Sequence, residues 1–79
     1  MPLFYFHLQR DGGRLDDEEG MRLPDKEAAW YQAVRSAREL VRAELLLGGR
    51  WEAQAILIED DSGGAVDTLP LADVARYAM

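Results

Sequence analysis

The residues LPDKEAAWYQAVRSARELVRAELLLGG, numbers 23–49, decide the fold. From Lys26 to Leu47 they contain no proline or glycine, and the helix-favouring residues alanine, leucine, arginine and glutamate dominate. Asp25 can cap the free amides at the start of a helix, where the helix dipole also favours the negative charge of Glu27. Gly48-Gly49 suits the left-handed conformation that follows a last helical turn. The sequence therefore predicts a helix over residues 26–47.

This helix is amphipathic, which indicates that it packs on another layer. At 100° per residue one apolar stripe forms, made of Trp30, Ala33, Val34, Ala37, Leu40 and Val41. Ala29 and Leu47 flank the stripe on one side, and Leu45 flanks it on the other. Glu44 interrupts the stripe and Leu46 lies on the polar side, so the last turn departs from the pattern. Either the helix leaves its support there, or Leu45, Leu46 and Leu47 form an apolar knob with Trp51. Trp51 fits the end of the core and an interface equally well.

Strand signals lie on both sides of the helix. Residues 3–10 alternate at period two, which separates Phe4, Phe6 and Leu8 from Tyr5, His7 and Gln9. The alternation leaves open which of the two sets faces the helix, because a shift of one residue exchanges them. Asp11-Gly12-Gly13 predicts a turn, and residues 14–16 predict a short return strand. The four acids Asp16 to Glu19 suit only an exposed edge of the sheet.

The second half predicts a hairpin and a short helix. Residues 52–60 form a strand, 60–64 a turn and 65–69 the return strand, and Pro70 should stop the pairing because it has no amide. Residues 71–77 predict a short terminal helix. Its inward residues are Leu71, Val74 and Ala75.

The prediction is one α+β domain over residues 1–79: a small antiparallel sheet of three or four strands in β(β)αββ order. One long helix packs on one face, with a possible short C-terminal helix. One helix covers one face only. The C-terminal segment or another subunit must then cover the opposite face, which is expected to carry Tyr5, His7, Ala55, Leu57 and Leu69.

Composition narrows the possible partners and the location. Fifteen acidic and nine basic side chains give a net charge of −6, so whole-protein attraction to nucleic acid or anionic lipid is not expected. With 48% hydrophobic residues and no cysteine, the chain has the composition of a folded domain without disulfides. The sequence shows no targeting segment and no apolar run of about 20 residues, so we expect a cytoplasmic protein and no membrane contact.

Few residues suit catalysis or cofactor binding. Cysteine is absent, hydroxyl residues are scarce and His7 is the only histidine, which we interpret as a structural or interface residue that hydrogen-bonds a neighbour. The acids at 16–19 lack the spacing of a calcium loop and predict an exposed charged edge or loop. The glycine pairs do not match a phosphate loop. We therefore expect no enzyme, no metal, no cofactor and no small molecule.

The helix also carries a polar stripe of Tyr31, Arg35, Arg38 and Arg42, at spacings of four, three and four. These arginines could bind a carboxylate-rich peptide or a phosphate backbone, although a solvated face with Glu39 paired to Arg35 and Arg42 explains them more simply. The candidate interaction surface comprises Tyr31, Arg35, Arg38, Arg42, Leu46, Trp51, Tyr5, His7 and Leu57.

Three hypotheses follow from these features. The first is a non-enzymatic interaction module that forms a homodimer or other homo-oligomer, or that binds a protein partner. The second is an acidic regulator, or antitoxin-like protein, that occupies a basic nucleic-acid-binding site on a partner. The third, less favoured, is direct nucleic-acid contact through the arginine stripe.

Several segments together resemble a known family. They are Pro2 with the aromatic strand through His7, then Asp11-Gly12, Asp17-Glu18-Glu19-Gly20, Leu23-Pro24-Asp25 with the following helix, and the late hairpin. This combination resembles a family of short bacterial proteins classified only as a domain of unknown function. The order Phe4-Tyr5 departs from the family's more frequent tyrosine then phenylalanine. The resemblance implies a bacterial, single-domain, intracellular protein and no known activity.

Overall fold

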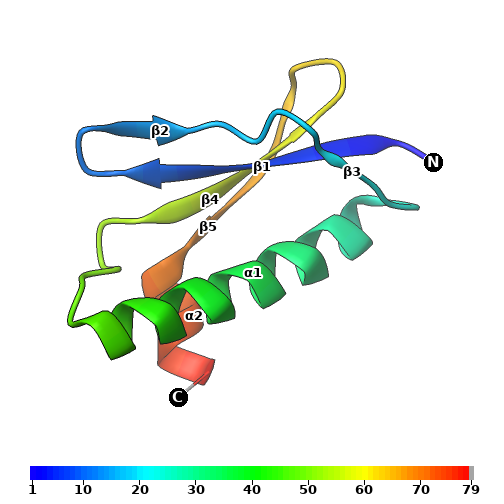
Figure 1. Cartoon of the computed structure of the whole chain (residues 1–79). Coiled ribbons are helices and arrows are strands. Elements are labelled where there is room, and N and C mark those ends of the chain that lie inside the picture. Colours follow the sequence, from blue (N-terminus) through cyan, green and yellow to red (C-terminus); the bar gives the residue numbers. More distant parts are fainter. Residues whose placement is uncertain (79) are drawn as a thin grey trace.

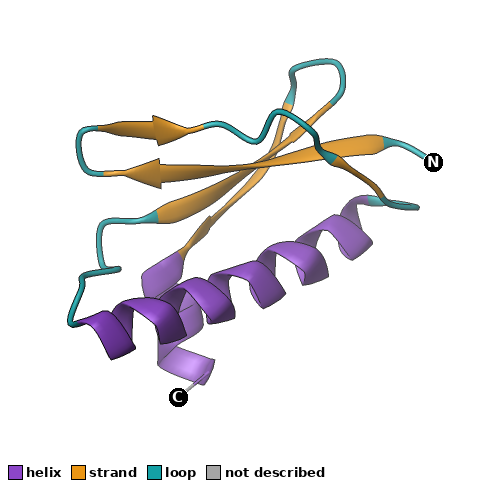
Figure 2. Cartoon of the chain, in the orientation of Figure 1, coloured by secondary structure: helices purple, strands orange, loops and turns teal. Residues whose placement is uncertain are grey.

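The computed structural model describes the backbone of residues 1–78 and the side chains of residues 1–76. It confirms the α+β class: a five-stranded antiparallel sheet carries both helices on one face (Figures 1 and 2). The elements in chain order are β1 (Leu3–Arg10), β2 (Gly13–Leu15), β3 (Met21–Arg22), α1 (Lys26–Leu47), β4 (Ala55–Asp60), β5 (Ala65–Pro70) and α2 (Leu71–Ala78).

One edge of the sheet is a strand in two pieces. The strand order is β2-β1-β4-β5, and β3 also pairs with β1. Leu15 of β2 lies opposite Leu8, and Met21 of β3 lies opposite Phe4. The segment 16–20 bulges out between these two pairs. The expected count of three or four strands is corrected to five, because the chain resumes pairing with β1 after its acidic run.

Helix α1 begins and ends where its local signals predict. The Asp25 carboxylate accepts the Ala28 N–H at 2.8 Å. Gly48 adopts the left-handed conformation, with φ of 72°, and closes the last turn. Ala29, Ala33 and Ala37 are completely buried at intervals of four residues. This ridge of small side chains lets the helix backbone approach the sheet closely.

The core lies between the sheet and the two helices. Phe4, Ile56 and Ile58 face α1, so the face of β1 with Phe4, Phe6 and Leu8 points toward the helix, which the sequence had left open. The predicted inward residues of α2 are also buried: Leu71, Val74 and Ala75. Leu69 pairs with Ile56 and is buried in this core, so its expected place on the opposite face is wrong.

Helix α2 packs beside α1 and against β5. Figure 1 shows both helices below the sheet, so the expectation that the C-terminal segment covers the opposite face is not met by α2. The elements before it also differ slightly from prediction. Strand β4 starts at Ala55, because residues 51–54 form a turn in which the Gln54 N–H donates to the Trp51 carbonyl at 2.9 Å. The return strand was predicted to end at Leu69, before Pro70. It ends one residue later, because Pro70 lies opposite Ala55 as the last residue of β5.

The β4–β5 turn lies where the sequence predicts it and is organised by Asp60. Its carboxylate accepts the Ser62 hydroxyl at 2.5 Å and the N–H groups of Ser62 and Gly64, each at 3.0 Å. These bonds, that of the Ser62 hydroxyl first, hold the pKa of Asp60 below its ordinary value. In the part of the chain that the structure describes, neither helix is long and apolar enough to cross a membrane.

Candidate functional site

His7 lies on the sheet face opposite the helices and is only 6% exposed. Its Nδ1 accepts the N–H of Asp17 at 3.0 Å, and its Nε2 lies 2.9 Å from Glu59 Oε1. Because Nδ1 is an acceptor, the hydrogen-bond network assigns the proton to Nε2, which donates to Glu59. The Tyr5 ring stacks on the imidazole with centroids 6.1 Å apart. The prediction that His7 hydrogen-bonds a neighbour is confirmed, and both ring nitrogens are occupied.

Asp17 organises the bulge that interrupts the edge strand. Its carboxylate accepts the N–H groups of Phe6 at 3.1 Å, Glu19 at 3.2 Å and Gly20 at 3.1 Å. Phe6 belongs to β1, so the side chain takes the place of the main-chain acceptor that the bulge removes. Asp16, Glu18 and Glu19 are exposed as predicted. For Asp17, however, the prediction of a solvated charge is wrong, because this residue is partly buried and bonded on both oxygens.

The environment of Asp17 favours the ionised carboxylate. Burial alone would raise its pKa, but the N–H groups of Gly20, Phe6 and Glu19 together outweigh that effect and lower the pKa. Gly20 closes the same bulge with φ of +72°. A Cβ at this position would lie 3.0 Å from the Phe4 carbonyl oxygen, so only glycine fits without strain.

A shallow acidic hollow of about 430 Å³ lies beside this bulge. Tyr5, His7 and Glu59 line it together with Arg14 and several acids of the two adjoining turns. Arg14 pairs with Asp16 at 2.6 Å. Among the described residues no group of three or more histidine, cysteine or acidic side chains is arranged to hold a metal ion.

The predicted residues of the open sheet face are less exposed than expected. His7 is buried, and Tyr5 and Leu57 are partly buried. The bulge at residues 16–20 packs against His7 and Tyr5 and so covers part of this face, which was expected to need the C-terminal segment or another subunit. The structure thus brings Tyr5, His7 and Leu57 together on one face but leaves little of their surface free.

The end of α1 carries three exposed leucines, of which Leu46 belongs to the predicted surface. Leu45 is 45% exposed, Leu46 83% and Leu47 82%. Trp51 is partly buried and packs against the core, which fits the core-end alternative. Leu15 of β2 is also exposed, at 59%, and was not among the residues of the predicted interaction surface.

The polar stripe lies along the exposed side of α1. Tyr31, Arg35, Arg38 and Arg42 are all exposed. Within residues 1–76 no ion pair joins these arginines to Glu39, so the expected surface pairs are absent. Arg38 also lines a groove between α1 and α2, which depends on the position of α2 and was not predicted.

The other edge of the sheet is β5, and it also carries features that hinder pairing with an added strand. The Thr68 N–H donates to the Asp67 carboxylate at 2.8 Å. The pairing register shifts between Ile58 and Glu59, which leaves Val66 as an extra residue in β5. Pro70 has no N–H. Bulges, a carboxylate and a proline are features that discourage an edge strand from pairing with another chain.

These features define a small α+β domain whose sheet is bulged at both edges and covered by helices on one face. The chain belongs to the family described as Domain of unknown function (DUF6894), which matches residues 3–72. The match spans β1, the bulge, α1 and the β4–β5 hairpin, and it confirms the predicted resemblance. No curated protein and no solved structure matches the chain.

Proposed function

We propose that this protein is a non-enzymatic interaction module that self-associates or binds a protein partner through the end of α1. The observation that carries the proposal is the exposure of three consecutive leucines, Leu45 to Leu47, at that end. Single exposed apolar residues are common on protein surfaces, whereas three exposed leucines around one last helical turn make the end of the helix apolar, which favours association. A domain of this size also has little core to spare, which favours stabilisation by a partner.

The other candidate surfaces support association less well. The sheet edges are interrupted or capped, and the face that carries His7 is largely covered. We further propose a bacterial cytoplasmic location for the module. The absence of cysteine supports it, and cell fractionation of the native host tests it.

The test compares wild type with a double variant, Leu46→Ser and Leu47→Ser. Size-exclusion chromatography with light scattering measures the mass, and affinity capture with nuclease treatment identifies stoichiometric partners. Leu15→Ser is the matched control, because it also removes an exposed leucine but lies on β2. We expect the oligomer or partner to be lost in the double variant and kept in the control. A monomer without any leucine-dependent partner would contradict the proposal.

A second candidate function is an acidic regulator that occupies a basic nucleic-acid-binding site on a partner. The exposed acids Asp16, Glu18 and Asp61 around the hollow favour it. Partner binding should then weaken steeply with added salt and should respond to Asp16→Asn with Glu18→Gln. Binding that ignores salt and these changes, but needs the leucines, would rule this candidate out.

A further inference from the structure

The two helices enclose a groove of about 440 Å³, which we call the interhelical groove. This volume falls within the range of small-molecule sites, about 300–1,000 Å³. One wall is formed by three residues of α1 at intervals of four: Trp30, Val34 and Arg38. Residues of α2 form the other wall, and Leu69 of β5 contributes to the floor. The interior is therefore mainly apolar.

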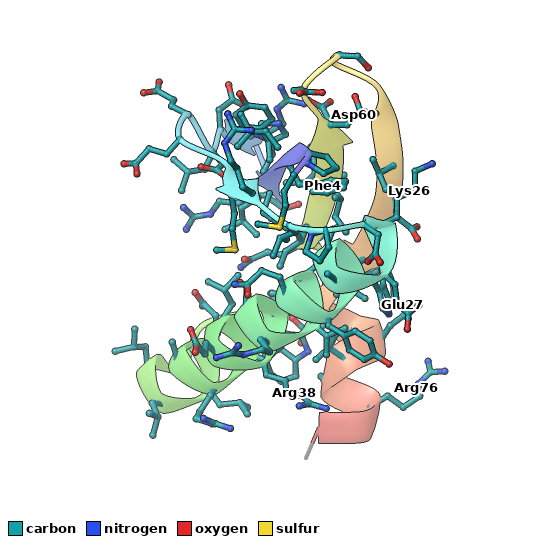
Figure 3. All side chains as sticks on the ribbon, turned by 90° about the vertical axis from the view of Figure 1, so that its right-hand side faces the viewer. Phe4, Lys26, Glu27, Arg38, Asp60 and Arg76 are labelled. Carbon is teal, nitrogen blue, oxygen red and sulfur yellow. The ribbon has the colours of Figure 1, made fainter. Side chains whose placement is uncertain are left out.

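Each wall carries one guanidinium group. Arg38 comes from α1 and Arg76 from α2, and both are exposed (Figure 3). Within residues 1–76 neither arginine forms an ion pair. Asp73 also lines the groove, so its three charged residues sum to +1 in a chain whose net charge is −6. The groove is thus a locally basic site with an apolar interior.

This combination suits a ligand with one carboxylate and an apolar body. A guanidinium binds a carboxylate through two parallel hydrogen bonds, and an apolar body would cover Trp30 and Val34. A second carboxylate would meet Asp73. A peptide main chain would need strand or turn partners, and the adjacent edge of β5 is capped at Thr68 and ends at Pro70.

We propose that the interhelical groove binds a small free monocarboxylic acid with an aromatic or branched apolar group, held by Arg38 and Arg76. This site is separate from the leucines at the end of α1. The result of its test is therefore independent of whether the proposed interaction function is correct.

The experiment titrates the 15N-labelled full chain with 3-phenylpropionate and follows the two tryptophan indole N–H signals by NMR. Trp30 lines the groove and Trp51 does not, so Trp51 is an internal control, and Trp51→Phe assigns the signals. We expect a saturable shift of Trp30 with Trp51 unchanged. Arg38→Gln or Arg76→Gln should weaken binding about three- to tenfold.

Matched controls separate this site from general attraction. Arg35→Gln removes an exposed arginine of the same helix outside the groove and should leave affinity within about twofold. The neutral 3-phenylpropionamide and the dicarboxylate phenylsuccinate should both bind more weakly than the acid. The proposal is overturned if no saturable shift occurs, if the amide binds equally well, or if Arg35→Gln acts like Arg38→Gln. Tighter binding of acetyl-Gly-Gly-Phe than of the free acid would overturn the assignment to a small acid.

Discussion

Replacing Asp17 by alanine should destabilise the whole domain, although the residue belongs to an acidic run at the edge of the sheet. Its carboxylate accepts three backbone N–H groups, and one of them, that of Phe6, belongs to β1. Its own N–H donates to the buried His7. The side chain therefore fixes the bulge to the sheet at the position where main-chain pairing is interrupted.

The magnitude follows from what each donor loses. The Phe6 N–H sits at the strand edge under the bulge, and an unsatisfied buried donor costs about 1–3 kcal/mol. The N–H groups of Glu19 and Gly20 are nearer to water, so we assign them about 0.5 kcal/mol each. The expected loss for Asp17→Ala is about 2–4 kcal/mol, out of about 4–12 kcal/mol for a domain of this size. Asp17→Asn should lose about half as much, since it retains one acceptor oxygen.

Urea denaturation at neutral pH, followed by circular dichroism, measures the free energy of unfolding. In thermal unfolding the alanine variant should melt about 8–30 °C below wild type. Asp16→Ala is the matched control, because Asp16 is the neighbouring acid and its pair with Arg14 is exposed. That control should change stability by less than about 1 kcal/mol. Equal losses in the two alanine variants would refute the structural role of the Asp17 carboxylate.

Three further predictions concern the same fold. The pKa of Asp17 is lower in the folded state than its ordinary value of 3.8. The stabilisation by this carboxylate is therefore present above pH 3.8 and is lost as the pH falls through the folded-state pKa. On acidification, the urea midpoint of wild type should fall more than that of Asp17→Asn. Gly20→Ala should cost about 1–3 kcal/mol of stability, and more than Gly12→Ala. Both glycines have positive φ, but only a Cβ at Gly20 would meet β1 backbone within 4 Å, and thermal melting compares the two variants. Ala33→Leu should cost about 1–3 kcal/mol by overpacking the completely buried ridge of α1, whereas Ala43→Leu on the exposed side should be nearly neutral by urea denaturation.

Helix α1 was predictable from sequence because its signals are local. The Asp25 cap, the uninterrupted run of helix formers and Gly48 all act within a few residues, and the structure confirms both ends. The inward residues of α2 followed from the same periodicity. The position of α2 beside α1 did not, because it depends on how the chain leaves β5, and the interhelical groove was therefore missed.

The corrections concern contacts between residues that are distant along the chain. The face of Leu69 depends on its pairing with Ile56, and a shift of one residue reverses a strand's faces. Asp17 looked like one acid among four because its partner Phe6 lies 11 residues away. The lone Gly20 was a signal that could have indicated the bulge, since it ends the acidic run immediately before pairing with β1 resumes.

The roles of Asp17 and Asp67 change how the acidic composition is interpreted. Asp17 accepts the Phe6 N–H at one sheet edge and Asp67 accepts the Thr68 N–H at the other. Each carboxylate occupies a main-chain donor that an added strand would otherwise use, so part of the negative charge serves the sheet edges themselves. Net charge alone is therefore weak support for a basic partner. These occupied donors make strand pairing a less favourable mode of association, so the proposed interaction relies on side chains such as the exposed leucines at the end of α1.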